Sequence, residues 1–123
     1  MPKIKIDKLT SCIIDAIQDK KGTDIRVLDL SEIAGASAQT FVIGTGRTPT
    51  QVSAIADSIE ERVKSDLGDK PVNIHGTRNS QWIIMDYGSV MVHIFVPDMR
   101  GYYDLEGLWS DAPCELIPDL EAV

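Results

Sequence analysis

The sequence predicts a single α/β domain with a mixed β-sheet of about five strands and two main helices on one face. Its 123 residues suffice for one hydrophobic core. A strand–helix–strand unit in the first two thirds requires a parallel strand pair. Two strong strand patterns further on are separated only by Gly88-Ser89, which is typical of an antiparallel hairpin. The predicted order of elements is α-β-β-α-β-β-β-α.

The first elements follow from hydrophobic periodicity. Apolar residues at helical spacing predict a helix over about residues 5–20, and Lys20-Lys21-Gly22 ends it with cations and a glycine. Residues 24–30 then predict a strand, and the β-rich run 40–43 predicts a second, buried strand.

The second helix has the clearest start signal. Thr48-Pro49-Thr50-Gln51 forms a capping box with proline at the first helical position. An apolar stripe at helical spacing follows, and Gly68 ends the helix. Residues 72–75 predict the next strand, parallel to 40–43 through a right-handed crossover.

The last third begins with the hairpin. Residues 81–87 and 90–96 are its two strands, and Pro97 ends the second. Residues 102–109 predict a short helix, followed by an irregular tail that contains Pro113 and Pro118.

Composition and charge narrow the class of protein. A 43% apolar and 25% charged chain, without an apolar run of about 20 residues and without a signal peptide, predicts a cytoplasmic protein. Cys12 and Cys114 are interpreted as reduced thiols, and a disulfide is the alternative. Six of the seven excess negative charges lie in residues 98–123, where seven acids face Arg100 alone. This distribution disfavours RNA binding and favours a basic protein partner, although solubility alone also explains an acidic tail.

No catalytic, cofactor or metal site is predicted. Gly44-Thr45-Gly46 precedes a helix but lacks the pattern of a dinucleotide or phosphate loop, so tight-turn glycines explain it. A nucleotidyltransferase needs two carboxylates spaced i, i+2 on a strand, but Asp57 lies on a helix and Ile59 occupies its partner position. His75 and His93 have no ligand at metal-site spacing.

The hairpin carries the predicted binding site. If Asp86 pairs with Met91 and Ile84 with His93, one face is almost wholly apolar and the other is apolar with polar groups. Asp86 and His93 then become diagonal neighbours, which favours a structural or interface hydrogen bond over a catalytic pair. Because two helices cover only one face, we expect the mixed face to lack cover and to bind a protein. The alternative is that Trp82 fills a core beneath the C-terminal helix.

Several motifs in order resemble the ribosomal silencing factor (Iojap-like) family. They are Lys21-Gly22-Thr23-Asp24-Ile25, residues 41–46, residues 51–57, His75-Gly76, the hairpin 82–95, and residues 102–109 with Asp111-Ala112-Pro113. The resemblance covers roughly residues 5–113. We therefore divide the chain into an Iojap-like domain, 1–113, and an acidic C-terminal tail, 114–123, which matches no motif of the family.

The resemblance implies a function without catalysis. Members bind the large ribosomal subunit through large-subunit ribosomal protein number fourteen, block joining of the small subunit and repress translation when nutrients are scarce. Their fold is related to nucleotidyltransferases but lacks the catalytic carboxylates. The implied partner-binding residues are Trp82, Ile84, Asp86, Tyr87, Met91 and His93. A degenerate nucleotidyl-transferring enzyme and a homodimerising scaffold remain open alternatives.

Overall fold

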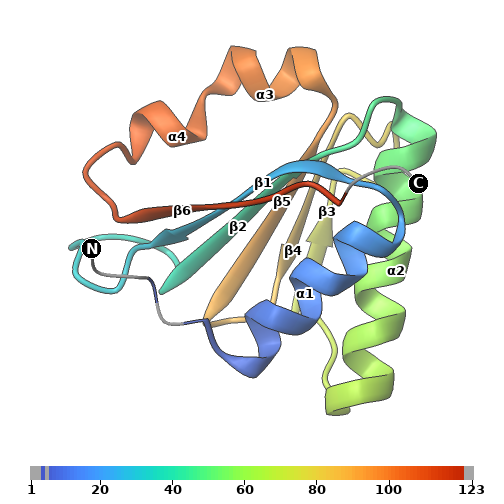
Figure 1. Cartoon of the computed structure of the whole chain (residues 1–123), viewed down its shortest axis with the longest axis horizontal. Helices are drawn as coiled ribbons and strands as arrows, with labels where there is room; N and C mark the ends of the chain where they lie inside the picture. Colours follow the sequence, from blue (N-terminus) through green and yellow to red (C-terminus); the bar gives the residue numbers. More distant parts are fainter. Residues whose placement is uncertain (1–3, 5, 121–123) are drawn as a thin grey trace.

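A computed structural model describes residue 4 and residues 6–120 (Figure 1). Within them the chain forms α1 (Lys8–Asp19), β1 (Thr23–Asp29), β2 (Thr40–Thr45), α2 (Pro49–Leu67), β3 (Asn73–His75), β4 (Trp82–Asp86), β5 (Val90–Phe95), α3 (Pro97–Tyr103), α4 (Leu105–Leu108) and β6 (Cys114–Ile117). The predicted single mixed-sheet α/β domain is confirmed. Residue 5, the expected start of the first helix, lies outside the described residues.

The described part of the chain forms one six-stranded sheet, in the order β3-β4-β5-β2-β1-β6. β2 and β5 are parallel, and the four other neighbouring pairs are antiparallel. The predicted parallel pairing of residues 40–43 with 72–75 is wrong, because β3 lies at the sheet edge and pairs with β4. Only three residues long, β3 buries little apolar surface, so the strongly apolar β5 takes the central place beside β2.

α1 and α2 lie side by side on one face of the sheet, as predicted (Figure 1). The Asp7 carboxylate caps α1 by accepting the Thr10 N–H over 2.8 Å. Thr48 caps α2 through the Gln51 N–H, and Gly68 ends it in the left-handed conformation. The Gln51 side chain accepts the Arg47 N–H instead of the Thr48 N–H, a variation on the expected capping box.

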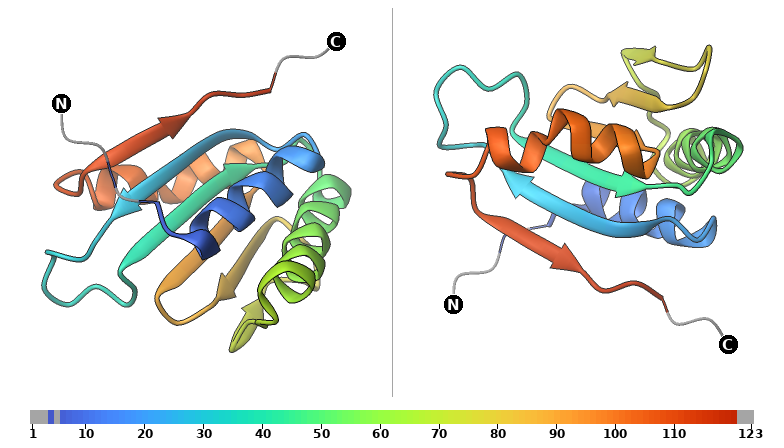
Figure 2. Two further views of the ribbon diagram at one scale, coloured as in Figure 1. Left: turned by 60° about the horizontal axis from the view of Figure 1, so that its bottom comes forward. Right: turned by 90° about the horizontal axis from the view of Figure 1, so that it is seen from above.

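α3 and α4 lie on the opposite face of the sheet (Figure 2). One short helix over 102–109 was predicted, but Asp104 adopts a left-handed φ of +46° and divides the region into two helices. With Met99, Leu105 and Trp109, this segment covers a second core cluster around Leu28, Phe41, Ile43 and Phe95. The expectation that this face lacks intramolecular cover is therefore wrong over β1, β2 and much of β5.

The predicted irregular acidic tail is also wrong in its first part. Cys114–Ile117 forms β6 along the edge of β1 (Figure 2). The side chain of Ile117 packs against the core under α1 and α2. β6 was not predicted, because its strand pattern is only four residues long and lies between Pro113 and Pro118. Residues 121–123 of the tail lie outside the described residues.

Candidate partner-binding surface

The register of the hairpin agrees with the prediction. Trp82 lies opposite Phe95, Ile84 opposite His93 and Asp86 opposite Met91. The side chains of Trp82, Ile84, Asp86, Met91 and His93 therefore share the face that carries α3 and α4. Tyr87, the sixth predicted site residue, is buried in the core on the opposite face, where burial raises the pKa of its phenol. The structure thus brings five of the six residues together and separates Tyr87 from them.

Trp82 and His93 are joined directly. The indole Nε1–H of Trp82 donates to Nδ1 of His93 over 3.1 Å. The indole also stacks on Phe95, with ring centroids 4.9 Å apart. Trp82 itself remains partly exposed. Trp82 therefore packs on the core with one side, as the alternative prediction expected, and reaches the surface with another.

His93 is a buried, neutral residue. Its side chain is only 4% exposed, and burial lowers its pKa from an ordinary 6.5 to about 4. Because Nδ1 accepts from Trp82, the imidazole proton resides on Nε2, which has no hydrogen-bond partner among the described residues. His93 therefore supports Trp82 from beneath and presents no group to solvent.

Asp86 has a separate local role. Its Oδ1 accepts the Gly88 N–H over 2.8 Å and so closes the hairpin turn. The predicted hydrogen bond between Asp86 and His93 does not form. Asp86, Ile84 and Met91 remain partly exposed beyond the cover of α3 and α4. Together with Trp82, these three residues are the accessible part of the hairpin face.

The structure adds three residues that the site prediction missed. Tyr102, Tyr103 and Leu108 are exposed by 80%, 45% and 71%. Tyr103 lies against Trp82, with ring centroids 4.6 Å apart, and Tyr102 meets Tyr103 edge-on at 5.1 Å. The sequence could have indicated Tyr102 and Tyr103, because neighbouring residues of a helix point in different directions and are rarely both buried.

We call the accessible residues of the hairpin and of the two short helices together the aromatic surface. It consists of Trp82, Ile84, Asp86, Met91, Tyr102, Tyr103 and Leu108. The exposed carboxylates Asp98, Asp104 and Asp111 lie on or beside α3 and α4. The aromatic side chains therefore lie beside several negative charges.

The loop before α2 has little free hydrogen-bonding capacity. The Thr48 hydroxyl accepts the backbone N–H of Gln51, and the side-chain oxygen of Gln51 accepts the N–H of Arg47. The side-chain NH₂ of Gln51 donates to the carbonyl oxygens of Lys20 and Lys21.

Among the described residues, no group of three or more His, Cys, Asp or Glu side chains is placed to hold a metal ion. None of the described helices combines the length and hydrophobicity that a membrane span requires.

Comparisons with known proteins agree with the fold. The chain is similar to the ribosomal silencing factor RsfS of Chromobacterium violaceum, with 35% identity over 107 residues, 87% of this chain and 86% of the relative. It is 39% identical to that of Bacillus subtilis over 98 residues, 80% and 81% of the two chains. The chloroplastic protein Iojap of Zea mays is 31% identical over 125 residues, which cover 94% of this chain and 52% of that protein.

Two crystal structures have the same fold. A Chromobacterium violaceum protein superposes with a TM-score of 0.81 at 32% identity, covering 98% of this chain and 95% of the other. A Bacillus halodurans protein superposes with a TM-score of 0.75 at 31% identity, covering 89% and 98%. The family profile described as "Ribosomal silencing factor during starvation" matches residues 3–123. The chain therefore belongs to the ribosomal silencing factor family.

Proposed function

We propose that this protein binds the large ribosomal subunit in the cytoplasm through ribosomal protein number fourteen and blocks joining of the small subunit. Translation is thereby repressed when nutrients are scarce. The block is steric and requires no catalysis, cofactor or metal. The observation that carries the proposal is the aromatic surface, in which Trp82 and Tyr103 pack against each other and remain accessible beside an acidic segment.

The composition of this surface supports a protein partner. Tryptophan and tyrosine bury large, rigid areas and dominate the binding energy of many interfaces. The surrounding carboxylates favour a partner rich in Lys and Arg, as ribosomal proteins are, and disfavour direct binding of RNA phosphates. Asp86 is partly exposed at the hairpin end and is placed to pair with one such cation.

Co-sedimentation tests the proposal. The purified protein should pellet with isolated large subunits, fail to pellet with small subunits, and reduce formation of the joined ribosome. Trp82→Ala should weaken binding to the large subunit about 30-fold, roughly 2 kcal/mol, as expected for an interface hot spot. Leu67→Ala is the control, because Leu67 is a 38% exposed apolar residue at the end of α2, away from the aromatic surface.

Trp82→Ala also removes packing against Phe95, so binding must be compared with thermal unfolding at the assay temperature. A folded Trp82→Ala protein that binds and blocks joining like the wild type contradicts the site. Micromolar binding of a nucleoside triphosphate with Mg²⁺ in calorimetry would instead favour an enzyme. A stable dimer that buries the aromatic surface and does not bind large subunits would favour a homodimerising scaffold.

A further inference from the structure

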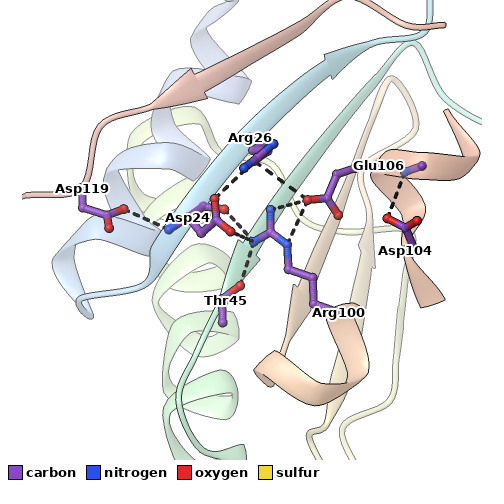
Figure 3. A network of polar contacts seen from close by, with 8 residues as sticks. Asp24, Arg26, Thr45, Arg100, Asp104, Glu106 and Asp119 are labelled. Carbon is purple, nitrogen blue, oxygen red and sulfur yellow. Dashed lines mark hydrogen bonds and ion pairs between the residues drawn. The ribbon is translucent and has the colours of Figure 1, made fainter. Parts of the chain in front are cut away.

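α3 carries a buried cation that the proposed function does not use. Arg100 is 7% exposed, and its guanidinium reaches from α3 to the strands below (Figure 3). Nη1 donates to the Asp24 carbonyl oxygen over 2.6 Å and to the Thr45 hydroxyl over 2.7 Å. Nε and Nη2 donate to one oxygen of Glu106 over 3.1 and 2.8 Å. One side chain therefore joins α3 to β1, β2 and α4.

The same network extends to Arg26 and Asp119. Nε of Arg26 donates to the Asp24 carboxylate over 3.2 Å and lies 3.9 Å from Glu106. The backbone N–H of Asp24 donates to the Asp119 carboxylate over 2.9 Å. Asp24 adopts a left-handed φ of +50°, a strained conformation for a residue other than glycine. A buried guanidinium is stable only when its donors are paired, so these contacts depend on one another.

Apolar packing alone holds the two short helices weakly. In α3 the buried residue is Arg100, and α4 has no buried residue. Met99, Leu105 and Trp109 contact the second core cluster, but each is only partly buried. The orientation of this segment therefore depends strongly on the polar network.

We propose that Arg100 is a positioning residue for partner binding. It does not touch the partner; it fixes α3 and α4 on the sheet so that the ring of Tyr103 stays packed against Trp82. A preformed aromatic surface loses less conformational entropy when it docks on a basic protein. The inference rests on the proposed function, because the large subunit is the partner whose binding is measured.

Amide hydrogen exchange tests the structural half of the proposal without a ribosome. In Arg100→Met, the amides of Asp104, Leu108 and Trp109, which bond within this segment, should exchange at least 10-fold faster. The amides in the central pair β2 and β5 should change much less. Arg100→Lys keeps the charge but loses the fork of donors and should be intermediate. Unchanged exchange in the segment would overturn the proposal.

A double-mutant cycle tests the binding half. Arg100→Met should weaken large-subunit binding at least 10-fold, and this loss should largely vanish in a Tyr103→Ala background, because Arg100 acts through Tyr103. Additive losses would show that Arg100 acts independently of Tyr103 and would contradict the proposal. If Arg100→Met does not fold, Arg100→Lys and Thr45→Val, which removes one acceptor, replace it.

The two proposals fail in different ways. If the wild-type protein does not bind large subunits, the proposed function is wrong, whatever the exchange data show. If the wild type binds and Trp82→Ala weakens binding, but the Arg100 variants bind normally, only the positioning role is wrong.

Discussion

The indole N–H of Trp82 donates to Nδ1 of His93 across neighbouring strands, with 3.1 Å between the two nitrogens. The register places Trp82 opposite Phe95 and His93 opposite Ile84, so the two bonded residues are diagonal partners on one face. The bond requires Nδ1 to be unprotonated. A buried residue, His93, therefore controls the orientation of an accessible one, Trp82.

The burial of His93 makes stability depend on pH. The folded pKa of His93 is about 4 because of burial, below the 6.5 expected in the unfolded chain. Between these values the unfolded chain binds a proton that the folded protein does not, so the free energy of unfolding decreases as pH falls from 6.5 to 4. The loss should be on the order of 3 kcal/mol. Urea unfolding of wild type and His93→Gln across this range measures it, and parallel pH profiles of the two proteins would refute the prediction.

Asp86 combines a turn contact with a charge, and two substitutions separate them. Asp86→Asn keeps an oxygen that can accept the Gly88 N–H, so it should unfold like the wild type but bind the large subunit more weakly. Asp86→Lys reverses the charge and also loses the turn bond, at about 1 kcal/mol of stability. It should bind more weakly still. Equal binding by all three proteins would exclude a charge contact at this position.

Two glycines form a matched pair for backbone strain. Gly76 and Gly88 have similar φ angles, +89° and +87°. A Cβ added at Gly76 would overlap the Trp82 carbonyl oxygen, whereas a Cβ added at Gly88 would have no heavy atom within 4 Å. Gly88→Ala should cost about 1–2 kcal/mol from the left-handed conformation alone. Gly76→Ala should cost at least about 2 kcal/mol more. Urea unfolding compares them, and similar costs would mean that the backbone near Trp82 adapts freely.

The C-terminal segment contributes a strand and several carboxylates, and the two contributions can be tested separately. Removing residues 114–123 should lower the melting temperature by roughly 10 °C, because β1 loses β6 and the Asp24 N–H loses Asp119. A deletion variant with the wild-type melting temperature would mean that neither contact contributes to stability.

Charge steering is better tested with the strand in place. Asp111→Asn with Glu115→Gln should slow association with the large subunit and flatten its dependence on salt. Asp57→Asn with Glu61→Gln removes the same number of charges from α2, outside the acidic segment, and should have less effect. Equal association rates for the two double variants would reduce the acidic segment to a solubility feature.

The sequence by itself determined the α/β class, α1 and α2, the hairpin and its register, and the recognition of the family. The helices and the hairpin rest on information close in the chain: helical periodicity and caps for the helices, and a two-residue turn that fixes the alternation of faces for the hairpin. The family was recognised from several short motifs that follow in order along the chain. Only the tertiary structure decided the parallel partner of β2, the pairing of β6 with β1, and the cover of the hairpin face by α3 and α4. Arg100 illustrates the reason. It donates hydrogen bonds to Asp24 and Thr45, which are 76 and 55 positions away in the sequence. Periodicity and turn patterns depend on neighbouring residues, so they cannot predict contacts between residues so far apart in the chain.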